Sequence, residues 1–360
     1  MSRFDLPQEF FDRTDSRLLV KPEPQYLYGI WFMDALALDL TPPEMLGVAG
    51  REVGGVGAAY TAAERDRLRL SNPLSRDICS AKVDFTAAPG GTVRLNRPVY
   101  ANTTYTEASR KIPSGTSIST TPTRIGSEQN NLTLFRYGGP YDATNSRVAP
   151  FPIEAFDANM GVHRQSSIVG TQLARDMHRF IDAVQVSLFD LAATAIYPDG
   201  MTAVNDATVA GMFPFTYEQL TRIERDMDIA NLPTFADGFR ALVLTPTQLQ
   251  QLDRDPEYQK SARFFPEYNV LFPHVYEKSC KKFHIFRSTT LNTTNNSSSV
   301  AIQYGHAIAP GAMLAGMGRR PRVASSTDDN YGETAKVIWI ADLGFGLSDS
   351  SFVYSVRSSG

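Results

Sequence analysis

The stretch Arg164–Ile196, RQSSIVGTQLARDMHRFIDAVQVSLFDLAATAI, carries the strongest periodic signal in the sequence. Its apolar side chains recur at alternating spacings of four and three residues, which is typical of a helix with one apolar stripe. The stripe consists of Leu173, Met177, Phe180, Val184, Leu188, Leu191 and Ala195, while Arg175, Asp176, Arg179, Asp182 and Asp190 fall outside it. The turn sequence Tyr197-Pro198-Asp199-Gly200 follows. We predict a helix of about 30 residues, roughly 45 to 50 Å long.

The segment before this helix, from about Asp84 to Pro150, is rich in Thr, Ser, Asn, Gly and Pro. Strand-like pieces at Gly91–Tyr100 and Asn131–Tyr137 favour extended hairpin structure. A polar segment of this length buries too little apolar surface to hold one conformation by itself, and loops beyond ~15 residues are usually functional or disordered. We therefore expect a neighbouring chain to hold it in place.

Residues 1 to about 80 combine a short apolar piece, Tyr26–Leu40, with the glycine-rich run GVAGREVGGVGAAY at Gly47–Tyr60. The run lacks the Gly-Lys-Ser/Thr ending that places a lysine on phosphates. We interpret it as a flexible, closely packed arm, and we expect little regular structure in this part of the chain.

The second half alternates helices and strands. Thr216 with Gln219, and Thr245 with Gln248, have the spacing of capping boxes, so each pair predicts a helix start. The first helix has one apolar face and should end by Pro233, and the second should reach about Asp253. The apolar face consists of Leu220, Ile223 and Met227. Strands are predicted at Phe239–Thr245, Lys282–Arg287, Val300–Gly305, Ala335–Leu343 and Phe352–Val356. The fold class is therefore α+β.

Composition limits the function classes. The chain has 360 residues, with 42% hydrophobic and 20% charged residues, which is typical of a folded protein. The net charge of −3 gives no basic footprint for a nucleic-acid reader. Cys79 and Cys280 are interpreted as reduced thiols, and no signal peptide or membrane span is recognised. We expect a protein that is made in the cytoplasm and stays soluble.

No catalytic or metal-binding motif is recognised, and we expect neither enzymatic activity nor a cofactor. The histidines are scattered without ligand spacing; His178 is predicted to be an edge or interface residue and His284 a packed strand residue. Acidic groups at Asp253, Asp255 and Glu257, and at Asp328-Asp329, could form a carboxylate pair, but solvated turn residues are the commoner use. The basic stretch Arg319, Arg320 and Arg322 could contact phosphate, although an inter-subunit salt link is favoured.

Three stretches carry a family resemblance: GFRALVLTPTQLQQLDRDPEYQ (Gly238–Gln259), FHIFRSTTL (Phe283–Leu291) and SSVAIQYGHAIAPGAM (Ser298–Met313). Together with the order of arm, extended loop, long helix, α+β body and terminal strands, they resemble the major capsid proteins of tailed bacteriophages, the Hong Kong ninety-seven type fold. The resemblance covers nearly the whole chain but lies in organisation, since this family has no short invariant motif.

The resemblance implies five segments: residues 1–83 as an N-terminal arm and the start of a peripheral domain, 84–150 as an extended loop, 151–199 as peripheral domain with a spine helix, 200–296 as an axial domain, and 297–360 as return strands, mainly peripheral. It implies self-assembly into pentamers and hexamers that form an icosahedral head around double-stranded DNA. The partners would be other copies, with portal, scaffolding and decoration proteins, and DNA would be contacted only non-specifically. The location would be the virion.

Inter-subunit contact candidates under this resemblance are Arg110, Lys111, Arg124, Arg136, Arg319, Arg320 and Arg322. Hinge candidates between loop and helix are Pro150, Pro152 and Gly161. Some relatives join neighbouring subunits through a lysine–asparagine isopeptide bond; Lys111 is the loop's only lysine, but no asparagine partner or catalytic acid is identified.

Three alternatives stay open. The shell of a bacterial nanocompartment shares the same fold but encloses an enzyme. A hydrolase or lyase could assemble its active site from scattered Asp, His and Arg residues without a recognisable motif. A tail or fibre protein is disfavoured because the chain shows no internal repeat.

Overall fold

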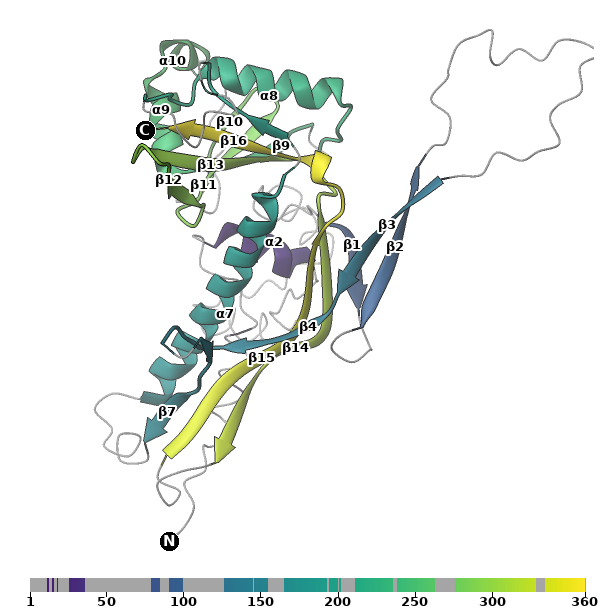
Figure 1. Ribbon diagram of the computed structural model, residues 1–360, viewed down its shortest axis with the longest axis vertical. Coiled ribbons are helices and arrows are strands. Elements are labelled where there is room, and N and C mark those ends of the chain that lie inside the picture. Colours follow the sequence, from purple (N-terminus) through teal and green to yellow (C-terminus); the bar gives the residue numbers. More distant parts are fainter. Residues whose placement is uncertain are drawn as a thin grey trace, which may run out of the picture.

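Two β-sheets, one long helix and a projecting two-stranded ribbon are the main features of the part of the chain that the structure describes (Figure 1). In this computed structural model, the described residues are 12, 15, 18, 26–35, 79–84, 91–99, 126–144, 146–154, 165–192, 194–199, 201, 211–235, 238–262, 276–327 and 334–359. The first sheet has five strands in the order β1-β14-β15-β4, with β7 also pairing with β15. These strands are β1 (Cys79–Asp84), β4 (Phe135–Gly139), β7 (Phe151–Glu154), β14 (Met313–Thr327) and β15 (Thr334–Leu347).

The second sheet has seven strands in the order β10-β11-β9-β13-β16-β8, with β12 pairing with β13. Its strands are β8 (Thr194–Ile196), β9 (Arg240–Leu244), β10 (Tyr276–Cys280), β11 (Phe283–Arg287), β12 (Thr293–Asn295), β13 (Ala301–Ile308) and β16 (Val353–Ser359), and the 3-10 turn η3 (Ser350–Phe352) precedes β16. Two ribbons complete the structure: β2 (Thr92–Val99) with β3 (Gly126–Thr133), and β5 (Tyr141–Asp142) with β6 (Arg147–Val148). Every strand predicted from the sequence overlaps one of these strands, which confirms the α+β class.

Helix α7 (Gln165–Phe189) is the predicted long helix, and it lies along the five-stranded sheet (Figure 1). Its 25 residues span about 37 Å. Two details of the prediction are wrong. The helix stops at Phe189 because the next residues turn and Thr194–Ile196 pair with β16, so Leu191 is 71% exposed and Ala195 lies in a strand. The buried stripe also runs one residue further round the helix, through Ile181, so Asp182 is buried instead of solvated.

Helix α2 (Leu27–Ala35) contradicts the expectation of little regular structure before residue 80. Its sequence, LYGIWFMDA, is apolar apart from Asp34, and Tyr28, Trp31 and Phe32 are fully buried. A helix that is apolar all round has no amphipathic period, which is why the pattern gave no signal. It packs against α7 and joins the main core, with Trp31 edge-on to Phe286 at 5.5 Å.

Helices α8 (Tyr217–Ile229) and α9 (Pro246–Arg254) contribute to the core on one side of the seven-stranded sheet, and α10 (Pro256–Ala262) follows. The capping box of α9 is present as predicted, with Thr245 and Gln248 exchanging hydrogen bonds. In α8, Thr216 caps the helix, but the Gln219 side chain bonds elsewhere, so the predicted box is only half formed. The predicted apolar face of α8 is confirmed.

Strand β14 was missed by the sequence reasoning, which took its residues as a basic stretch and a polar turn. Gly316, Gly318 and Pro321 interrupt the alternation that marks a strand, and the register slips on both sides of Arg319. The antiparallel pairing with β15 nevertheless continues to Thr327.

The main hydrophobic core draws on both sheets. It joins α2, α7 and β15 to Val243 and Phe286 of the seven-stranded sheet. The last 64 residues divide between the sheets, because β13 and β16 lie in the seven-stranded sheet while β14 and β15 lie in the five-stranded one. The domain boundaries given above stay a prediction. Among the described residues, no helix combines the length and the apolar character needed to span a membrane.

Candidate functional site

The ribbon of β2 and β3 projects away from the body (Figure 1). Its eight residue pairs are in continuous antiparallel register from Thr92 opposite Thr133 to Val99 opposite Gly126. At about 3.3 Å per residue, each strand is roughly 26 Å long. An isolated two-stranded hairpin is at best marginally stable in water, so its base must fix its direction.

Two leucine side chains that pack against glycines anchor the base of the ribbon. Leu132 and Leu134 are fully buried. A Cβ atom on Gly318 would lie 2.5 Å from Cδ2 of Leu134, and one on Gly346 would lie 3.3 Å from Cδ1 of Leu132. The missing side chains on β14 and β15 therefore make the room in which the leucines sit. This gives a packing reason for glycine at both positions.

A buried carboxylate adds a polar clamp beside these leucines. Asp342, on β15, has a side chain that is only 5% exposed, between Arg136 on β4 and Arg319 on β14. The Nε atom of Arg136 donates to Oδ1 at 3.0 Å, and Nε of Arg319 lies 3.6 Å from Oδ2. One buried negative charge thus holds two cations from the strands on either side. We call Leu132, Leu134, Arg136, Gly318, Arg319 and Asp342 the ribbon base.

The structure brings together two of the predicted contact residues, Arg136 and Arg319, but around an acceptor in their own chain. Both arginine side chains stay about half exposed, at 50% and 43%, and Arg320 and Arg322 are exposed on the same strand. Arg110, Lys111 and Arg124 lie outside the described residues, as does the glycine-rich run. The inter-subunit role of these residues stays a prediction. Asp342 was missed, and its signal was a single acid in the apolar strand IWIADLGFGL.

The structure describes two of the three hinge candidates, Pro150 and Pro152. Pro152 lies in β7, opposite Lys336 of β15, so it belongs to a sheet ladder. Pro150 lies between β6 and β7, outside any strand, and Gly161 falls outside the described residues. A hinge at these positions stays a prediction.

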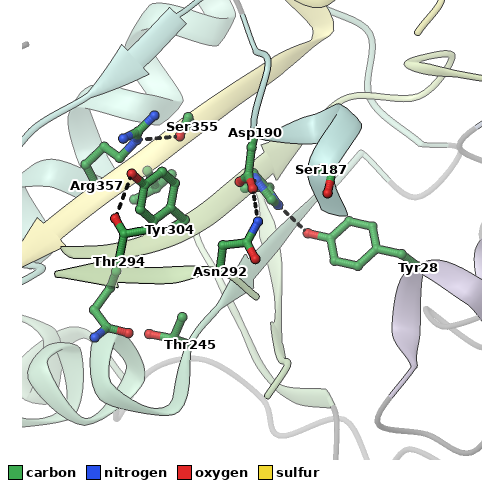
Figure 2. A network of polar contacts seen from close by, with 12 residues as sticks. Tyr28, Ser187, Asp190, Thr245, Asn292, Thr294, Tyr304, Ser355 and Arg357 are labelled. Atoms are coloured by element: carbon green, nitrogen blue, oxygen red, sulfur yellow. Dashed lines mark hydrogen bonds and ion pairs between the residues drawn. The ribbon is translucent and has the colours of Figure 1, made fainter. Parts of the chain in front are cut away.

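A second polar cluster lies where α2, α7 and the seven-stranded sheet meet (Figure 2). The Tyr28 hydroxyl is 2.6 Å from Nδ1 of His306, and Nε2 of His306 is 2.9 Å from Oδ1 of Asp190. Asn292 donates to the other oxygen of Asp190. A neutral imidazole protonated at Nε2 satisfies both contacts, because it donates to the carboxylate and accepts from the phenol. We call these four residues the junction network.

Asp182, about two helical turns before Asp190, connects the same helices. Its Oδ1 accepts hydrogen bonds from the backbone amides of Tyr28 and Gly29, at 2.9 and 3.1 Å, in the first turn of α2. A carboxylate is favoured at a helix N-terminus because the free amides and the helix dipole point at it. Burial nevertheless raises the pKa of Asp182 to about 6, against the hydrogen bonds from Thr290, Gly29 and Tyr28. Burial also raises the pKa of the Tyr28 phenol well above its ordinary value.

The order of atoms in the junction network is that of a proton relay, but the burial of its side chains favours a structural role. Tyr28 and His306 are fully buried, and their rings pack against Phe189 at 5.2 and 5.9 Å, so a substrate could not reach the phenol without opening the core. Within the described parts of the chain, no three His, Cys, Asp or Glu residues are grouped to hold a metal.

Two further histidines of the described residues, His178 and His284, are also buried. His178 was predicted at an edge or interface, which is wrong: it is buried, and its Nε2 lies 3.2 Å from the carbonyl oxygen of Leu18. His284 was predicted to be packed, and it is confirmed as buried against the Phe239 ring at 4.4 Å.

Solved capsid structures share this fold. The capsid of Ralstonia phage GP4 matches with a TM-score of 0.54 at 12% identity, over 78% of this chain and 86% of that chain. The cyanophage Pam1 capsid gives 0.54 at 10% identity over 76% and 87%, and the head of Helicobacter pylori bacteriophage KHP40 gives 0.53 at 10% identity over 77% and 86%. No family model and no curated protein matches the chain. The chain has the Hong Kong ninety-seven type fold of tailed-phage major capsid proteins, which confirms the predicted fold.

Proposed function

We propose that this protein is a major capsid protein whose copies assemble into a closed shell. The single observation that carries the proposal is the β2–β3 ribbon, which extends from the body and is anchored at its base by Leu132, Leu134 and the Asp342 clamp. A ribbon that cannot bury its own faces gains stability by lying on another surface, so its ordering is coupled to association. The fold that the chain shares with phage capsids supports the same proposal.

The anchored base explains how the ribbon could work in assembly. Rings of copies need heterologous contacts, in which one surface of a subunit meets a different surface of the next. A stiff base directs the ribbon toward that second surface before contact, which lowers the ordering cost of association. The half-exposed side chains of Arg136 and Arg319, with Arg320 and Arg322, would then lie where a neighbour's acidic groups can reach them.

The finer parts of the proposal follow the family. The shell would consist of pentamers and hexamers and form an icosahedral phage head around double-stranded DNA, after synthesis in the host cytoplasm. Portal, scaffolding and decoration proteins would be its partners, and a hinge near Pro150, Pro152 and Gly161 would fit one chain to both ring sizes. The net charge of −3 agrees with a wall that DNA slides along, since a strongly basic lining would bind phosphates at many points. The protein would act by assembling and not by catalysis.

The proposal is tested by electron microscopy and sedimentation of the purified chain beside a variant that joins Leu95 directly to its partner Asn130 through a short turn, which shortens the ribbon and keeps Leu132 and Leu134 in its base. The full chain should form closed particles, while the variant should stay folded and unassembled. Circular dichroism and urea unfolding of the variant are the control for folding. Particles with a portal vertex and packaged DNA would distinguish a phage head from a nanocompartment, whose uniform small shells would hold a cargo protein. A full chain that remains a small oligomer under all assembly conditions would contradict the proposal.

A further inference from the structure

Two short connections that run side by side join the two β-sheets (Figure 1). One leads from β13 to β14, and the other leads from β15 through η3 to β16. The Ala309 amide donates to the carbonyl oxygen of Phe352 at 2.9 Å, and the Ser348 amide donates to that of Ala312 at 2.8 Å. Among the described residues, no strand of one sheet pairs with a strand of the other. Hinge motions are absorbed by a few residues at the ends of elements, so these connections alone would leave the angle between the sheets free to vary.

Helix α7 adds a tie between the sheets at its end. It belongs with the five-stranded sheet, because the Trp339 indole of β15 donates to Oδ2 of Asp176 at 2.7 Å. Asp190, the residue after α7, binds His306 of β13 through one carboxylate oxygen and Asn292 through the other. A single tie at the end of a rod fixes the position of the seven-stranded sheet but leaves its orientation unrestrained.

Helix α2 contacts both sheets through two consecutive aromatic residues. Phe32 stacks on Phe345 of β15, with ring centroids 4.6 Å apart. Trp31 is edge-on to Phe286 of β11, with centroids 5.5 Å apart. Consecutive side chains of a helix are about 100° apart around its axis, so the two rings leave α2 in different directions. Both side chains are fully buried, and buried aromatic rings contribute large areas to packing.

The first turn of α2 is fixed in the same place by hydrogen bonds. The backbone amides of Tyr28 and Gly29 donate to Oδ1 of Asp182 on α7. The Tyr28 hydroxyl lies 2.6 Å from Nδ1 of His306, which gives α2 a second contact with the seven-stranded sheet. α2 is therefore held to α7 at its start, to one sheet by Phe32, and to the other sheet by Tyr28 and Trp31.

We propose that α2 is a clasp that sets the angle between the two sheets. The two connections act as the hinge, and the rings of α2 prevent rotation about it. Packed interfaces have discrete arrangements and do not deform continuously, so an α2 that is filled on both sides permits one angle. A subunit that has one shape before it meets a neighbour loses less conformational entropy on association.

Distances between spin labels on the two sheets, measured by double electron–electron resonance, test the clasp in the unassembled chain. The labels are attached at Ser325→Cys on β14 and Asn295→Cys on β12, which are exposed positions. Cys79→Ser and Cys280→Ala first remove the two cysteines of the sequence. A second label pair, Ser325→Cys with Ser187→Cys on α7, lies on one side of the hinge and reports general loosening.

Phe32→Leu opens the half of the clasp that holds the five-stranded sheet. Phe180→Leu is the matched control, because Phe180 packs α7 against Tyr137 and Trp339 of that same sheet. We expect the distance distribution between the sheets to be narrow in the wild type and about twofold broader in Phe32→Leu. The distribution in Phe180→Leu, and that of the second label pair in every variant, should keep the wild-type width.

Tyr28→Phe is the milder variant, and it keeps the test decisive if Phe32→Leu does not fold. It removes only the bond to His306, so the distribution between the sheets should broaden by a smaller amount. A distribution that is already broad in the wild type, or that keeps its width in Tyr28→Phe and in folded Phe32→Leu, would overturn the proposal. Equal broadening in Phe180→Leu would also overturn it, because any loss of aromatic packing would then loosen the molecule. Shell formation does not enter this measurement, so the result is independent of the proposed function.

Discussion

Replacing Asp182 by Asn should remove one pH-dependent part of the protein's stability. The carboxylate is buried on α7, and its Oδ1 accepts from the first-turn amides of α2. An asparagine keeps that oxygen in place and removes the buried charge. The substitution thus separates the hydrogen bonds, which both side chains can make, from the cost of burying an ionised group, which only aspartate carries.

The magnitude follows from the pKa. Burial raises the pKa of Asp182 from 3.8 to about 6, so the folded protein holds this proton more tightly than the unfolded chain does. The contribution of Asp182 to the free energy of unfolding is therefore highest below about pH 4 and falls as the pH rises through about 6. The difference between the two pKa values corresponds to about 3 kcal/mol, fully lost above pH 7.

Urea unfolding of the unassembled protein between pH 4 and pH 8 measures this difference. Relative to the wild type, Asp182→Asn should be about equally stable at pH 4 and up to about 3 kcal/mol more stable at pH 7. Asp199→Asn is the matched control, because Asp199 is exposed and its ion pair with Arg222 should contribute at most about 1 kcal/mol. A difference between wild type and Asp182→Asn that stays constant over this range, or that favours the wild type at pH 7, would refute the reasoning.

Three further substitutions test other parts of the structure by urea unfolding at pH 7. Gly318→Ala should destabilise the protein by about 1–3 kcal/mol and slow assembly, because its Cβ would meet the buried Leu134; unchanged values would contradict the packing of the ribbon base. Arg240→Met should cost about 1–3 kcal/mol, because the carbonyl oxygens of Leu232 and Pro233 lose their buried donor while Asp228 keeps its ion pair with Lys282; a neutral effect would show that these carbonyl oxygens find other donors. Tyr28→Phe should cost about 1–3 kcal/mol because it leaves Nδ1 of His306 buried without its donor, and an unchanged stability would argue against the junction network.

Local patterns in the sequence were sufficient for the elements whose signal is local. The capping residues Thr216 and Thr245 start helices where they were expected, and the apolar run at β9 is a fully buried strand. Period and capping depend on neighbouring residues, so they can be recognised without the tertiary structure. The long helix was recognised for the same reason.

The sequence predictions failed where contacts between residues distant in the sequence determine the structure. Asp182 looks like a surface residue of α7 until α2 places two amide groups over it. Strand β14 is interrupted by Gly318 and Pro321, but β15 supplies a continuous partner. The clamp around Asp342 could not be predicted, since Arg136 and Asp342 are 206 residues apart and meet only through the pairing of β4 with β15.

Hydrogen exchange of the ribbon tests the central claim most directly, by comparing the backbone amides of β2 and β3 in unassembled chains and in assembled shells. The account predicts that the amides of the outer pairs, toward Val99 and Gly126, exchange rapidly in the unassembled chain and become protected by at least tenfold in shells, while the amides of α7 change little. Equal protection of the ribbon in both states would contradict the claim that a neighbouring copy orders it.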